Sequence, residues 1–278
     1  MLTLSNHTKG LLYAFIAAVL WSTGGVFIKL ISLNSFQLSF FRSGIAALTI
    51  LIIFRKNAVI FNKQTIINGV FYSGILILFV LAAKTTTVAN AIFLQYTAPV
   101  FVFIFEPIIL KTKFEKVNLA AILICVIGMV LFFAGDLNPG DIEGNIYAIL
   151  SGIAFAAFLI GMKKNEPKYQ FASVFYGNLF ISIICAFSVF SISNLLTSDI
   201  IMFTYMGMFQ IGIAYVVFNF GLKRVDAVEA SLISMIEPIL NPVWTYLGYG
   251  EIPSNWAIVG GVIILIGLGY KTVRSVKL

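Results

Sequence analysis

Few side chains in this sequence could take part in chemistry, and the most informative ones lie inside long apolar stretches. Glu237 is the acid nearest to the middle of such a stretch, in the segment SLISMIEPILNPVW. Helical spacing places Ser234, Glu237, Asn241 and Trp244 on one face. A charge at the centre of a bilayer costs about 2.5 to 3.5 kcal/mol on insertion scales, so we expect Glu237 to face the protein interior and to have a partner or a function.

Arg42 is the basic residue inside an apolar stretch, in FFRSG, and it is the candidate partner of Glu237. If the two side chains pair, both are structural, and an Arg42→Ala variant should lose folded protein rather than substrate selectivity. If Glu237 is unpaired, its carboxyl group is a candidate proton carrier or cation ligand. Proton coupling is then an expectation.

Other polar or amphipathic side chains near the middle of apolar stretches are candidates for contact with a substrate. Tyr215 and Asn219 share a helical face with Gly212, and Trp21 shares one with Gly25. Small residues on these faces also permit close helix packing, which is the alternative interpretation. The predicted substrate-binding residues are Trp21, Gln95, Tyr96, Tyr215, Asn219, Ser234, Glu237 and Asn241.

The residues that would support an enzyme are missing from the sequence. His7 is the only histidine, which argues against a histidine metal site or a catalytic dyad. Cys125 and Cys185 both lie in apolar stretches and are expected to be small core residues. No phosphate-binding glycine loop, HExxH motif or serine–histidine pair occurs. We therefore expect no catalytic residue, no metal and no cofactor.

The elements that must position these residues are membrane helices. The chain has 278 residues, of which 60% are hydrophobic and 10% charged, whereas soluble domains are about half apolar and a quarter charged. Apolar runs of about 20 residues, each long enough to cross the bilayer core, recur along the whole chain. The ten expected spans are 10–31, 35–54, 65–84, 88–110, 117–134, 144–163, 171–190, 200–222, 228–248 and 255–272.

The basic residues orient these spans. With a cytoplasmic N-terminus, 15 of the 18 basic residues fall on the cytoplasmic side, while Lys29 and Lys84 fall outside and Arg42 lies within the membrane. This positive-inside distribution favours a multi-pass protein of the cell membrane, the inner membrane where there are two, with both termini cytoplasmic. The net charge of +7 thus reports topology rather than nucleic-acid binding.

The two halves of the chain are related to each other. At an offset of 139 residues, Lys84, Pro99 and Gly128 superpose on Lys223, Pro238 and Gly267. At an offset of 134 residues, Gly10, Tyr13, Ala14 and Lys29 superpose on Gly144, Tyr147, Ala148 and Lys163. The predicted domains are therefore two five-helix repeats, residues 1–136 and 137–278. An odd number of spans in each half makes the repeats inverted, which is the basis of alternating access.

Prolines mark where a substrate would bind. Pro99, Pro107, Pro238 and Pro242 lie in the fourth and ninth spans, which are repeat partners. Proline removes a helical hydrogen bond, and unpaired carbonyls at membrane depth occur only against protein or a water-filled cavity. Matching interruptions therefore predict a binding site between the two helices. A simple proline kink is the alternative.

Four segments carry a resemblance to a known family. They are LAAKTTTVANAIFLQYTAPVF from Leu81 to Phe101, FGLKRVDAVEASLISMIEPIL from Phe220 to Leu240, FFRSG around Arg42, and LGYGE ending at Glu251. In this order they resemble EamA-type members of the drug/metabolite transporter superfamily over essentially the whole chain. Thr112 stands where the family pattern places the acid that Glu251 supplies in the second half.

The resemblance implies ten helices in two inverted five-helix repeats, with a central cavity lined by spans one, three, four, six, eight and nine. It also implies transport of amino acids, amines or other small metabolites, often outward. An acid before the proline of span nine fits the family pattern, so Glu237 alone does not select a cationic substrate.

The resulting prediction is a secondary active transporter that exports or exchanges small metabolites by alternating access. The sequence leaves open whether it is a monomer or a homodimer. The alternatives are an intramembrane enzyme or flippase acting on lipid-linked substrates, which would need paired catalytic groups at one depth, and a channel, for which rings of charge or carbonyl filters are not evident.

Overall fold

The computed structural model is helical throughout. It describes residues 5–134, 141–192, 194–249, 252 and 254–276, and no strand occurs among them. The first half contains α1 (Asn6–Ser22), α2 (Gly24–Leu30), α3 (Ser35–Phe54), α4 (Lys63–Thr85), α5 (Val88–Gln95), α6 (Ala98–Leu110) and α7 (Lys116–Phe132). The second half contains α8 (Ile142–Lys164), α9 (Gln170–Cys185), α10 (Thr197–Tyr205), the π-helix η4 (Met206–Ile213), α11 (Ala214–Leu222), α12 (Ala227–Ser234), α13 (Ile236–Tyr249) and α14 (Asn255–Val276).

Within the described part of the chain, eight helical stretches are long and apolar enough to cross a membrane. Two expected spans differ from this set. Span five is α7, an apolar helix of only 17 residues. Span nine is divided into α12 and α13 at Met235. The prediction of an all-helical, multi-pass membrane protein is confirmed. The boundary between the two predicted domains, at residues 136 and 137, lies outside the described residues.

Polar side chains start several of these helices. The Asn34 side chain accepts hydrogen bonds from the first turn of α3, and its backbone N–H donates to the Gln37 side chain. Asn62 forms the same capping box with Thr65 at α4. Asp141 caps α8. Such caps satisfy the free N–H groups of the first turn. They also define where each helix begins in a sequence whose apolar runs follow one another closely.

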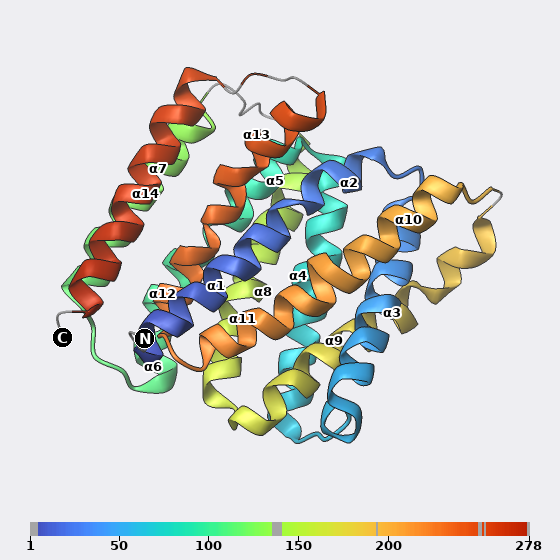
Figure 1. Cartoon of the computed structure of the whole chain (residues 1–278), viewed down its shortest axis with the longest axis horizontal. Coiled ribbons are helices and arrows are strands. Elements are labelled where there is room, and N and C mark those ends of the chain that lie inside the picture. Colours follow the sequence, from blue (N-terminus) through green and yellow to red (C-terminus); the bar gives the residue numbers. More distant parts are fainter. Residues whose placement is uncertain (1–4, 135–140, 193, 250–251, 253, 277–278) are drawn as a thin grey trace, which may run out of the picture.

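Helices from the two halves interleave. α4 packs against α8 and α9, α3 against α9, and α1 against α11. At one edge of the molecule α7 and α14 lie side by side, apart from the main bundle (Figure 1). Glycines make that approach close, since a Cβ on Gly260 would lie 2.5 Å from the carbonyl oxygen of Gly128. The fold is therefore a single body in which each half depends on the other.

The start of α1 and the end of α14 lie at the same end of the bundle (Figure 1). His7, at the start of α1, is 2.8 Å from Glu229 at the start of α12. Lys271, near the end of α14, lies 3.3 Å from Asp226 and 3.4 Å from Glu115, which precede α12 and α7. These contacts hold the start of α1, the end of α14 and the connections before α7 and α12 together at the same end of the bundle.

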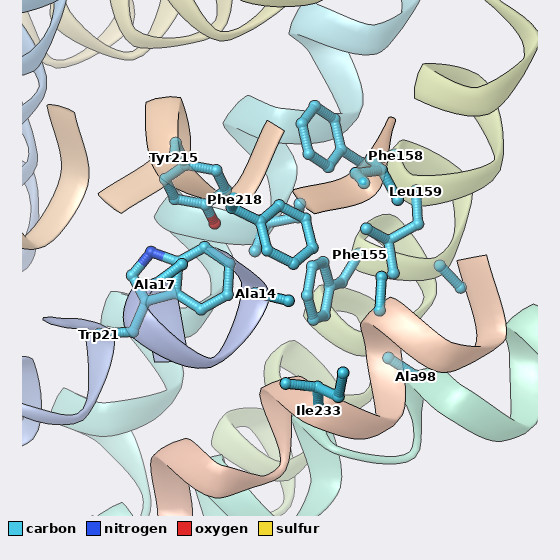
Figure 2. Packing of buried hydrophobic residues seen from close by; sticks show 14 of the residues in the cluster. Ala14, Ala17, Trp21, Ala98, Phe155, Phe158, Leu159, Tyr215, Phe218 and Ile233 are labelled. Atoms are coloured by element: carbon cyan, nitrogen blue, oxygen red, sulfur yellow. The ribbon is translucent and has the colours of Figure 1, made fainter. Parts of the chain in front are cut away.

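Aromatic side chains fill the centre of the bundle. The ring of Trp21 in α1 lies 4.8 Å, centroid to centroid, from the rings of both Tyr215 and Phe218 in α11. Phe155 and Phe158 of α8 lie on the side of Phe218 that faces away from Trp21, and the small side chain of Ala14 leaves room for these rings (Figure 2). This cluster supports one wall of the site described next.

Candidate functional site

Helix interruptions occur beside two of the four prolines, Pro99 and Pro238, whereas Pro107 and Pro242 lie inside α6 and α13. α5 ends at Gln95, and α6 begins with Pro99 in its first turn. α12 ends at Ser234, and α13 begins two residues later with Pro238 in its first turn. Both interruptions are confirmed, and the ends of α5 and α12 are 139 positions apart, the offset of the repeat.

Two further irregularities adjoin the same region, and neither contains a proline. The first transmembrane helix breaks at Thr23, between α1 and α2. η4 is a π-helical stretch within the span that runs from α10 to α11. Widened turns of this kind are common at functional sites because they re-aim side chains. Here η4 brings Gln210 and Ile211 to the cavity wall.

A small cavity lies where these irregular segments meet, with a volume of about 40 Å³. Each water molecule needs about 10 to 15 Å³ of such volume, so the cavity has room for a few. Six residues singled out from the sequence line it, namely Trp21, Arg42, Gln95, Tyr96, Tyr215 and Glu237. The rest of the wall includes Phe79 of α4 and Phe155 of α8, which sequence reasoning missed because nothing distinguishes them from other apolar aromatic residues.

Glu237 and Tyr96 join the two halves across this cavity. The Tyr96 hydroxyl donates a hydrogen bond of 2.6 Å to Oε2 of Glu237. Tyr96 follows the last residue of α5 and is 5% exposed, whereas Glu237 is half-buried in the first turn of α13. The two irregular helices of the repeat are thus connected at their breaks.

Arg42 reaches the same cavity but does not pair with Glu237. Its Nη2 donates to the carbonyl oxygen of Leu76 at 3.2 Å, its Nε has no hydrogen-bond partner, and the residue is 1% exposed. Among the described residues, no carboxylate lies within ion-pair distance of this guanidinium. The structural Glu237–Arg42 pair considered from the sequence is therefore absent from this conformation. Pairing depends on side-chain direction, which helical spacing does not fix.

Other polar groups of the wall are held in place or left without partners. Gln95 donates to the Ser151 hydroxyl at 2.7 Å, and that hydroxyl donates to a backbone carbonyl of α4. Gln210 donates to the carbonyl of Trp21 at 3.4 Å. The Trp21 indole Nε1 and the Gln210 Oε1 are buried without hydrogen-bond partners. The site therefore offers free donors and a free acceptor.

Three predicted substrate-binding residues are not among those that line the cavity. Ser234 donates to the carbonyl of Ala230 within its own helix. Asn219 is fully buried, and its amide nitrogen and oxygen have no partners. Asn241 packs closely against Gly25 of α2. Trp244, on the same predicted stripe, donates to Ser22 at 2.8 Å, so this face of α13 contacts α1 and α2.

Glu106, near the end of α6, is a second buried acid, with 5% exposure. Its two oxygens accept hydrogen bonds from the backbone N–H groups of Ala227 and Val228, at 3.3 and 3.2 Å. Glu106 thus caps α12 from the other half of the chain. Glu251 lies outside the described residues.

Within the described ranges, no cluster of His, Cys, Asp and Glu side chains is arranged to hold a metal ion. Cys125 and Cys185 are buried and unpaired. His7 contacts Glu229 near the start of α1, away from the cavity wall.

The class of protein that this fold and site define is a multi-pass helical membrane protein with a polar cavity between interrupted helices. The model of the EamA-like transporter family matches the chain twice, over residues 8–134 and 142–270. The chain belongs to the EamA-like transporter family.

Individual relatives agree with this assignment. A Clostridium kluyveri protein named as an uncharacterized transporter is 25% identical, over 93% of this chain and 91% of the relative. The pseudopaline exporter CntI of Pseudomonas aeruginosa is 22% identical, over 93% of this chain and 94% of the exporter. A solved crystal structure matches 98% of this chain and 99% of its own, with a TM-score of 0.83 and 17% sequence identity, and it therefore supports the fold alone.

Proposed function

We propose that this protein is a secondary active transporter that exports or exchanges small metabolites, such as amino acids or amines, by alternating access. The observation that carries the proposal is the polar cavity at the meeting point of the interrupted helices. Its wall combines residues of both halves, and Tyr96 and Glu237 bond across it. Interrupted helices in matching positions of two repeats are the usual location of a substrate site in such carriers.

Two features support ten spans in two inverted repeats, residues 1–136 and 137–278. The family model matches each half separately. The interruptions after Gln95 and Ser234 lie 139 residues apart. In this arrangement α7 and the divided pair of α12 and α13 are the two remaining spans, short or broken but still apolar.

A cytoplasmic location of both termini accounts for the distribution of charge. The start of α1 and the end of α14 lie at one end of the bundle, together with the basic connections before α4, α7, α9 and α12 (Figure 1). Positive charge in short loops favours the cytoplasmic side.

Polar contacts at that end, some of them between the halves, hold the α11–α12 connection in place. Glu106 binds the N–H groups of Ala227 and Val228. Lys163, at the end of α8, donates to the carbonyl of Val225 at 2.7 Å. These contacts fix the α11–α12 connection. Opening toward the cytoplasm would have to break them, and equivalent contacts at the opposite end would have to form.

The proposed coupling is argued from the site, and the proposed direction from a relative. Glu237 is a carboxyl group in the cavity wall whose partner is a hydroxyl, so it can exchange its proton when the cavity is hydrated. We propose proton-coupled transport through this group. The outward direction rests on the relative named as an exporter.

Counterflow in proteoliposomes tests the function. Vesicles loaded with an unlabelled amino acid or amine should take up the same labelled solute transiently above equilibrium, whereas protein-free vesicles should not. An enzyme or flippase acting on lipid-linked substrates would show no trans-acceleration by a soluble solute. A channel would show uptake that an internal solute does not accelerate.

A further inference from the structure

We propose that Arg42 is the receptor for a carboxylate group of the transported molecule, so that the substrates are amino acids and related carboxylates, and amines without a carboxylate are excluded. This inference rests on the proposed transport function and narrows its substrate class. It also replaces the purely structural role expected for Arg42 from the sequence.

The charge of Arg42 is uncompensated. Arg42 and Glu237 are the charged residues of the cavity wall, and Glu237 bonds to Tyr96 rather than to the guanidinium. The titratable groups that surround Arg42 are the hydroxyls of Tyr72 and Tyr215 and the thiol of Cys185. None of these is an acid of carboxylate strength. A buried cation without an anion is costly, and the cost is removed when an anion binds.

Two of the unpaired hydrogen-bonding groups of the cavity-lining residues are donors. A guanidinium carries five N–H donors, and the structure assigns one of them, through Nη2, to the Leu76 carbonyl. The Nε of Arg42 and the indole Nε1 of Trp21 are both buried and without partners. In Figure 2 the Trp21 nitrogen lies on the side of Tyr215 and away from Phe155. A planar guanidinium with free N–H groups matches the geometry of carboxylate and phosphate groups, and the carboxylate is the one that an amino acid carries.

The cavity wall also offers acceptors for an ammonium group. The hydrogen bond from Tyr96 occupies one oxygen of the Glu237 carboxylate, and the buried Oε1 of Gln210 is a free acceptor. Tyr215 lies close enough to both Arg42 and Glu237 to interact electrostatically with each. The cavity wall therefore carries one cation and one anion that are not paired with each other, which matches a zwitterion.

A purely structural role does not explain why this position carries a charged side chain. The single hydrogen bond to the Leu76 carbonyl needs one donor, which a neutral side chain such as glutamine would supply at lower desolvation cost. The cavity volume of about 40 Å³ is smaller than an amino acid requires, so the carboxylate binds when alternating access widens the site.

The test uses matched ligands that differ in the carboxylate. The probes are L-alanine, L-leucine and L-phenylalanine, each with its amide and its decarboxylated amine. Ligand-induced thermal stabilisation of the purified full-length protein reports binding, since a ligand of the folded state raises its apparent stability. Counterflow of the same compounds reports transport. The proteins are wild type, Arg42→Lys and Arg42→Gln, with Lys271→Gln as the matched control, because Lys271 is a buried cation outside the cavity that two acids already pair.

We expect at least one acid to bind wild type about 10- to 100-fold more tightly than its amide and amine, in line with hydrogen bonds to charged groups. Arg42→Gln should reduce this ratio to about 1, Arg42→Lys should keep part of it, and Lys271→Gln should keep all of it. The wild-type comparison stands even where Arg42→Gln fails to fold.

Equal affinity for an acid and its amine in wild type, no binding of any acid, or full discrimination in folded Arg42→Gln protein would overturn the assignment. Counterflow of amines as efficient as that of acids would remove the role of Arg42 and leave the carrier function intact. Absence of counterflow for every probe would instead refute the transport function, and this inference with it.

Discussion

The hydrogen bond between Tyr96 and Glu237 gives the sharpest prediction about the site. A Tyr96→Phe variant removes one hydroxyl, which is buried and donates to the carboxylate at 2.6 Å, and keeps the aromatic ring. Hydrogen bonds to charged groups contribute about 1.5 to 3 kcal/mol to stability. Because this one connects the interrupted helices of the two halves, its loss should lower the free energy of unfolding by that amount.

Tyr147 provides a matched control. Its hydroxyl also bonds to a carboxylate, that of Glu143, one turn away at the exposed start of α8. A Tyr147→Phe variant should change the free energy of unfolding by less than about 0.5 kcal/mol, as is usual for surface substitutions. Both variants can be measured by equilibrium unfolding with sodium dodecyl sulfate in mixed micelles.

A double-mutant cycle assigns the effect to the pair. When Tyr96→Phe is made in a Glu237→Leu background, which leaves the hydroxyl no acceptor at this position, the two losses should be non-additive by about 1 kcal/mol or more, as expected for residues in contact. Additive losses, or a Tyr96→Phe effect no larger than that of Tyr147→Phe, would refute a buried hydrogen bond across the cavity.

The remaining predictions concern coupling, closure and packing. Glu237→Gln should insert normally and transport more slowly, with a rate that no longer depends on pH; a wild-type rate and pH profile in proteoliposomes would contradict its place in the pathway. Glu106→Gln weakens the cap of α12 by about 1 kcal/mol, so hydrogen exchange of the first turn of α12 should accelerate severalfold, and unchanged exchange would remove Glu106 from the closure. Gly260→Val would drive a side chain into the backbone at Phe132 and should abolish the monodisperse peak in size-exclusion chromatography, whereas Gly269→Ala, with open space around it, should not; equal yields would contradict the close packing of α7 and α14.

The helices and their two principal interruptions could be predicted because their causes are local. Long apolar runs specify spans, and a proline removes a hydrogen bond wherever the chain folds around it. The breaks beside Pro99 and Pro238 are therefore visible in the sequence. The repeat offset also links them, and the six predicted residues at the cavity follow from depth and helical face.

The irregularities without prolines could not be predicted. These are the break at Thr23 and the π-helix Met206–Ile213, in which Gly207 and Gly212 approach the distant helix α3 closely. The burial of Glu106 likewise depends on α12 arriving at its carboxylate from the other half of the chain. No sequence pattern in either segment predicts the contact between them.

The partners of the two charged residues at the cavity could not be predicted from helical spacing either. Arg42 and Glu237 are the charged residues at the cavity, and proximity in depth suggests a pair. The structure instead gives Glu237 a tyrosine and Arg42 a backbone carbonyl. The two charged side chains are therefore not paired with each other.

The most direct test of alternating access is the accessibility of the cavity from each face of the membrane. A single cysteine at Gln210, in a background lacking Cys125 and Cys185, can be labelled with an impermeant thiol reagent in right-side-out and inside-out vesicles. We predict labelling from both faces, with reciprocal changes: Glu106→Gln should raise labelling from the cytoplasmic face and lower it from the outer face. Labelling from one face only, or a simultaneous rise from both, would contradict a carrier that opens to one side at a time.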